Sequence, residues 1–99
     1  MRFKIPSTFQ VGGTDYKVTS KKNLAADRSR YGETAYFSRE IHLDPELSSQ
    51  ERESTFIHEV AHVVEDTYAC RLSESQVKRM AEGIYQVLRQ LEVADAQES

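Results

Sequence analysis

A chain of 99 residues is long enough for one domain but too short for a multi-lobed enzyme, because so small a fold buries only a modest share of its surface. Hydrophobic residues make up 38% of the chain and charged residues 29%, which is lean but sufficient for one folded core. The formal net charge of −3 argues against nucleic-acid binding and against binding to anionic lipid, since both need a basic surface.

The first half of the chain has the alternating apolar pattern of short strands. Residues 9–11 and 16–19 flank a pair of glycines, which predicts a hairpin with a glycine turn. Residues 34–37 and 40–44 are rich in aromatic and branched side chains, and they are close enough in sequence to pair with each other. We therefore expect a short antiparallel sheet of three to four strands.

The second half of the chain carries the signals of two helices. A Ser-x-x-Glu capping box at Ser48 predicts a helix over about 49–68. The same kind of start signal at Ser73 precedes apolar residues at helical spacing and predicts a second helix over about 74–93, with 94–99 frayed. The whole chain is thus expected to be one α+β domain, with the sheet first and the helical hairpin second.

The first predicted helix contains the pattern His-Glu-x-x-His, formed by His58, Glu59 and His62. A spacing of four residues puts both imidazoles on one helical face, about one turn apart, where they can hold one zinc ion. Glu59 is rotated away from the pair but is close enough to take a proton from a water that the metal activates, so it is the candidate general base. The apolar residues of this helix lie on the opposite arc, so the histidines are expected to face a cleft or the second helix rather than the core.

A catalytic zinc usually has three protein ligands, so a third must lie downstream. Glu74 borders the buried face of the second helix, whereas Glu82 lies on its charged, solvated side. A tightly antiparallel hairpin would nevertheless bring Glu82 alongside His62. We favour Glu74 and keep Glu82 as the alternative; a first-turn glutamate is also favourable with the helix dipole without any metal.

Two further residues could belong to such a site. Glu65 faces the same way as the two histidines and could orient an imidazole, a role that metal-bound histidine usually requires. His42 is expected to be an outward-facing sheet residue, because its sequence neighbours offer no ligand spacing.

Cysteine content and hydropathy bear on the compartment. The single cysteine, Cys70, cannot form an internal disulfide, and the first ten residues lack the apolar run of a secretory signal. No stretch approaches the roughly 20 apolar residues that span a bilayer. We therefore expect a cytoplasmic protein whose partners include neither membrane nor nucleic acid.

These residues resemble the small zincin-like metallopeptidases of phages and prophages, which are similar in outline to the ImmA/IrrE group. The likeness covers residues 40–92, its specific part is the His-Glu-x-x-His element, and the segments that carry it are 41–44, 55–62, 72–77 and 81–88. The resemblance implies a minimal zincin fold, in which a short sheet precedes an active-site helix and a second helix supplies a glutamate at the position of Glu74. It also implies that the edge strand, residues 34–37, binds an extended peptide by strand addition.

The chain lacks the glycine and third histidine of metzincins, and we expect no second lobe that would wall a substrate cleft. The sequence predicts a zinc-dependent metallopeptidase, in which one Zn²⁺ is held by two histidines and Glu74, Glu59 is the general base, and the substrate is a peptide or protein. The alternative is a non-catalytic module that a metal stabilises and that binds a phage or host regulator. A metal-free adaptor is a third hypothesis, weakened by the intact motif. The sequence leaves the oligomeric state open.

Overall fold

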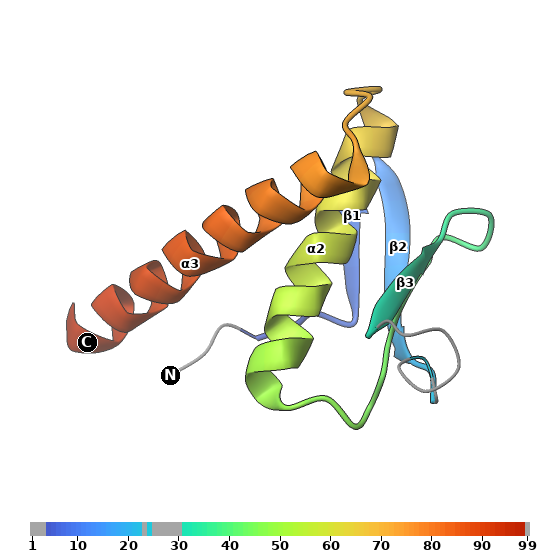
Figure 1. Ribbon diagram of the computed structural model, residues 1–99. Coiled ribbons are helices and arrows are strands. Elements are labelled where there is room, and N and C mark those ends of the chain that lie inside the picture. The colour runs from blue at the N-terminus through green and yellow to red at the C-terminus, as the bar shows by residue number, and fades with distance from the viewer. Residues whose placement is uncertain (1–3, 23, 25–30, 99) are drawn as a thin grey trace.

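The computed structural model describes residues 4–22, 24 and 31–98, with side chains up to residue 91. In the part of the chain that the structure describes, four strands precede the two helices, as expected for an α+β domain (Figure 1). The elements are β1 (Thr8–Val11), β2 (Thr14–Ser20), β3 (Gly32–Ala35), β4 (Glu40–Leu43), α2 (Ser49–Thr67) and α3 (Glu74–Glu98).

The four strands form one sheet in the order β1-β2-β4-β3. The glycine-turn hairpin pairs β1 with β2 antiparallel, and β3 pairs with β4 antiparallel, both as predicted. The expectation of an all-antiparallel sheet is wrong, because β2 and β4 run parallel, with Val18 opposite Ile41. β4 is one of the two inner strands, and its apolar residues Ile41 and Leu43 are fully buried. β3 lies beside it at one edge of the sheet.

Both helices begin where their capping boxes predict. The Ser48 hydroxyl accepts from the Glu51 amide at 3.2 Å, while the Glu51 carboxylate accepts from the Ser48 amide at 3.0 Å. Ser73 and Gln76 make the same reciprocal pair at the start of α3. α3 continues to Glu98, past the predicted end near residue 93, in a segment rich in the helix-favouring residues Ala, Glu and Gln. Neither described helix combines the length and the apolar character needed to cross a membrane.

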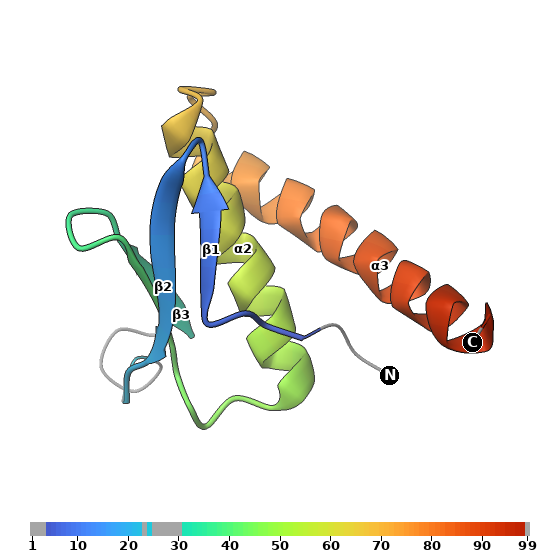
Figure 2. The same ribbon diagram turned by 180° about the vertical axis from the view of Figure 1, so that it is seen from behind.

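α2 covers one face of the sheet, and α3 packs against α2 (Figures 1 and 2). The apolar side of α2 is shared between these two neighbours. Phe56 meets the ring of Phe9 on β1 edge-on at 5.9 Å, while Ile57 joins the side chains of α3. The buried core consists of Tyr16, Ile41, Leu43, Phe56, Ile57, Val63, Ala81 and Tyr85.

Candidate metal centre

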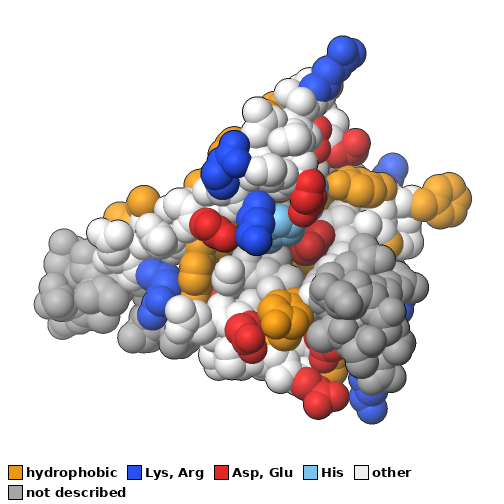
Figure 3. Space-filling view, in the orientation of Figure 1, with side chains coloured by type: hydrophobic (Ala, Val, Ile, Leu, Met, Phe, Trp, Pro, Cys, Tyr) orange, Lys and Arg blue, Asp and Glu red, His pale blue; other side chains and the backbone are white. Residues whose placement is uncertain are grey.

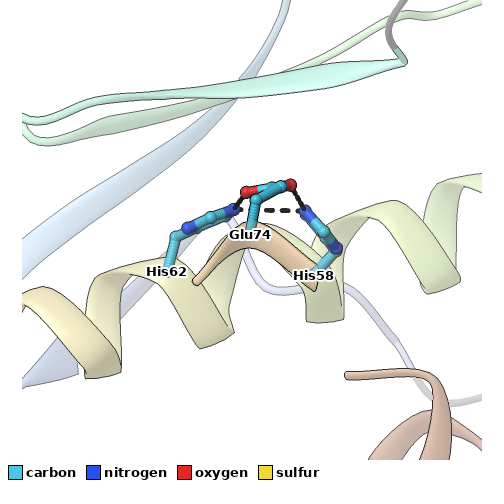
Figure 4. A group of neighbouring side chains, drawn as sticks. All are labelled: His58, His62 and Glu74. Carbon is cyan, nitrogen blue, oxygen red and sulfur yellow. Dashed lines mark hydrogen bonds and ion pairs between the residues drawn. The ribbon is translucent and has the colours of Figure 1, made fainter. Parts of the chain in front are cut away.

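The two histidines of the motif lie on the face of α2 that meets the beginning of α3. A reversal after Thr67, in which Ala69 and Arg71 adopt left-handed backbone conformations with φ of 52° and 55°, returns the chain over the middle of α2. α3 then starts at Glu74, directly above the histidine pair (Figure 4). A local helix spacing and one tight connection thus bring the three side chains together.

The carboxylate of Glu74 spans both imidazoles. Its Oε1 lies 3.0 Å from His58 Nε2, and its Oε2 lies 2.8 Å from His62 Nε2. The two Nε2 atoms are 3.2 Å apart (Figure 4). Among the described residues, this is the one group of three whose potential ligand atoms all lie within 4.8 Å of one another.

This donor set fits a zinc ion in both chemistry and spacing. Imidazole nitrogen and carboxylate oxygen are ligands that zinc prefers. A tetrahedral zinc with bonds of about 2.0–2.1 Å separates neighbouring ligand atoms by about 3.3 Å. The observed separations of 2.8, 3.0 and 3.2 Å are within about half an ångström of that value. Three protein ligands would leave one coordination position open, as catalytic zinc sites do.

Glu74, and not Glu82, meets the histidines. The two helices cross and diverge instead of forming a tight antiparallel hairpin (Figure 1). Among the described residues, Glu82 does not belong to the group whose ligand atoms converge. Glu82 still lines the cavity beside the group. Glu74 is 67% exposed, so a ligand in that place is reachable from solvent. That Glu74 binds metal stays a prediction, but its carboxylate lies where a third metal ligand would have to lie, beside both imidazoles.

Glu59 has a different environment from the two histidines beside it. It is one of the few buried charged residues, with 7% of its surface exposed. Its side chain extends from α2 toward β3. The Thr34 hydroxyl on β3 donates a hydrogen bond of 2.7 Å to its Oε1. Sequence reasoning missed this partner, because a threonine on a strand carries no signal of which helix residue it will meet 25 positions later.

An open cavity of about 600 Å³ lies in front of these groups. Its lining includes Thr34, Tyr36, Glu59 and the three candidate ligands. A second hollow of about 1010 Å³ adjoins it, since the two share Tyr31, Ser54, Thr55 and Glu82. Figure 3 shows the histidine surface in the middle of this face, with acidic side chains to either side of it. An extended ligand would therefore have room along the cleft.

Tyr36 is a cavity residue that sequence reasoning treated only as part of an edge strand. The strand ends at Ala35, so the predicted strand over 34–37 is displaced, and Tyr36 stands in the following turn beside the cavity. Partial burial, and then the negative charges of Asp66, Glu59 and Glu65, raise the pKa of its phenol to about 12. The phenol therefore keeps its proton, and so its ability to donate a hydrogen bond, well above neutral pH.

The two other residues that the sequence singled out lie apart from the group. Within the described chain, the carboxylate of Glu65 makes no hydrogen bond to either imidazole, so the expected orienting contact is not formed. His42 points to the opposite face of β4 from Ile41 and Leu43, as expected, and lies between the carboxylates of Glu33 and Glu40.

No protein-family model, curated protein or solved structure matches the chain. The function of the chain must therefore be inferred from the chemistry of the site itself.

Proposed function

We propose that this chain is a zinc-dependent peptidase whose metal is held by His58, His62 and Glu74. One observation carries the proposal: three zinc-type ligand atoms, two from α2 and one from α3, converge in the lining of an open cavity that also includes the buried carboxylate of Glu59. Bound zinc lowers the pKa of a coordinated water and polarises a carbonyl group, which is the chemistry that peptide hydrolysis needs.

Glu59 is the general base in this proposal. It follows the first ligand directly in sequence and lines the same cavity, so its carboxylate can receive the proton of the attacking water and later deliver it to the leaving amine. The hydrogen bond from Thr34 to Oε1 fixes the orientation of the carboxylate and hence the direction of its second oxygen. Thr34 is therefore a positioning residue, and Glu59 is the catalytic residue.

Tyr36 is suited to stabilise the negative charge that develops on the substrate oxygen. Its phenol borders the cavity and carries its proton at neutral pH, with a pKa that partial burial, and then the neighbouring carboxylates, raise to about 12. A preorganised hydrogen-bond donor at such a place lowers the barrier because it interacts more strongly with the transition state than with the substrate.

The substrate that fits this arrangement is an extended peptide. β3 is an edge strand, and Gly32, Glu33 and Thr34 from it line the cavity. A peptide added to that edge would lie along the cleft in front of the metal ligands, held by main-chain hydrogen bonds. The cavity lining has four carboxylates and one ammonium group, which favours peptides with basic side chains; these residues are Glu33, Glu59, Glu74, Glu82 and Lys78.

Metal content tests the site first. We would measure zinc by plasma mass spectrometry in protein purified without a polyhistidine tag, and compare His58→Ala and Glu74→Ala with Glu82→Ala as the matched control. We expect near-stoichiometric zinc in the wild type and the control, and loss in the other two variants. A wild type that stays metal-free after zinc is offered would refute the proposal.

A second candidate is the non-catalytic module that a metal stabilises. It is favoured by the origin of the ligands, since two come from α2 and one from α3, so that a metal would clip the two helices together. Glu59→Gln separates the two functions. The variant should keep its zinc in either case, but it should lose peptide hydrolysis only if the site is catalytic.

A further inference from the structure

α3 carries an apolar stripe that the fold of one chain does not cover. Met80, Ile84, Val87 and Leu91 are 46–56% exposed, although they are large and hydrophobic. Their spacing of four, three and four residues places them in one row along the helix. We refer to these four residues as the α3 stripe.

The α3 stripe is separate from the side of α3 that faces its own fold. Val77, Ala81 and Tyr85 are buried, while the α3 stripe lies next to them around the helix. Both ribbon views show α3 crossing α2 near its own beginning and then extending away from the sheet (Figures 1 and 2). The stability of a helix in a protein comes mainly from packing of its apolar face, so a partner that covers this part of α3 would stabilise it.

The exposed surface continues from the α3 stripe toward α2. A hollow of about 280 Å³ with an almost entirely apolar lining lies between the two helices, and Met80 and Ile84 form part of its wall. Val64 and Leu72 form another part of the wall, and Val64 is 39% exposed. The patch is thus a row of side chains beside a groove, which is the shape that a second helix would fill.

The residues that flank the α3 stripe on the side away from Val77, Ala81 and Tyr85 favour a second copy of the chain as the partner. Gln76, Gly83 and Gln90 are exposed there and carry no charge, so two identical stripes can meet without repulsion. A side chain added at Gly83 would enter open space, so another backbone can approach closely at that point. The charged residues Lys78, Glu82 and Arg89 lie on the far side of the helix.

The available area is consistent with such a pairing. The α3 stripe exposes on the order of 400 Å² of apolar surface in each copy, or about 800 Å² in two. This total is below the ~1,200 Å² at which stable specific interfaces begin, and it is in the range of weak, transient contacts. A reversible dimer is the outcome that this area supports.

We propose that two copies of this chain pair through the α3 stripe in a two-fold contact, with each copy presenting the same surface to the other. The pairing uses none of the residues of the metal centre, so it does not depend on the proposed peptidase function.

Sedimentation velocity over a range of protein concentrations tests the pairing. We expect the wild type to move from monomer to dimer with rising concentration. Val87→Glu, which places two like charges in the contact, should weaken the dimer by at least about 100-fold. Gln86→Glu adds the same charge at the next residue, outside the α3 stripe, and should leave the dimer intact.

Both substituted positions are exposed, so both variants are expected to fold, and circular dichroism verifies this. A wild type that is monomeric at every concentration would overturn the proposal and assign this face to a different protein. A dimer that persists in Val87→Glu would overturn it equally, because the contact would then lie elsewhere.

Discussion

Histidines and glutamates form two clusters on different parts of this fold, and their shortest distances are nearly the same. At the metal centre, Glu74 lies 2.8 and 3.0 Å from the two imidazoles. On the sheet, His42 lies 2.7 Å from Glu33 and 2.9 Å from Glu40. Distance alone would not distinguish a metal site from an ion-pair network.

The direction of the ligand atoms separates the two clusters. At the candidate metal centre, the rings of two histidines and the carboxylate of Glu74 come together (Figure 4), and one ligand atom from each residue lies within 4.8 Å of the others. In the sheet cluster, the two nitrogens of a single ring point away from each other, each to its own carboxylate, and Lys21 approaches Glu33 at 3.0 Å. Convergence therefore makes the first cluster the candidate for metal binding, while the second cross-links the strands β3 and β4.

The largest expected difference between the clusters is in metal binding. His58→Ala should weaken zinc binding by roughly 100- to 1,000-fold, since structural zinc sites with four protein ligands bind with about 10–16 kcal/mol, or about 2.5–4 kcal/mol per ligand, and 1.4 kcal/mol is tenfold. His42→Ala should leave zinc affinity unchanged. Titration against a zinc-selective chelator measures both. Equal losses in the two variants would mean that the clusters are not distinct.

A smaller effect is expected from the third ligand, which is the most exposed of the three. Glu74→Gln keeps the shape but removes the charge of the carboxylate, and we expect about a 10- to 100-fold loss of zinc affinity. Glu82→Gln makes the same change on the same helix and should cost less than about threefold. The reverse order in the chelator titration would transfer the ligand role to Glu82.

The sheet cluster should instead contribute to folding stability. His42→Ala removes two hydrogen-bonded contacts from a side chain that is only 15% exposed, and we expect about 1–3 kcal/mol less free energy of unfolding. His58→Ala, measured without metal, should cost less because that ring is bonded to an exposed carboxylate. Urea unfolding of both variants in the presence of a chelator gives the comparison, and equal costs would contradict it.

The sequence predicts positions that depend on local geometry, and it does not predict contacts between segments far apart in the chain. The positions of His58 and His62 follow from the helix period alone, and Ser73 fixes the start of α3 and so places Glu74. The sequence did not predict the parallel pairing of β2 with β4 or the contact of Thr34 with Glu59. Such partners are set by how the chain crosses over between elements, which residue spacing does not record.

The smallest expected effect is a pH dependence at the edge of the metal centre. Tyr36 has a folded-state pKa of about 12 against an ordinary value of 10.0, so the folded chain holds this proton more tightly than the unfolded chain. Its contribution to stability is therefore fully present below pH 10 and is lost as the pH rises from about 10 to 12.

Absorbance titration of the five tyrosines should resolve one late-ionising phenol that is missing in Tyr36→Phe. Tyr31→Phe is the matched control, because it removes an exposed phenol elsewhere in the cavity lining. If Tyr36→Phe removes an ordinary phenol instead, neither burial nor the neighbouring carboxylates raise the pKa of Tyr36 in the folded chain, and the expected pH dependence is absent.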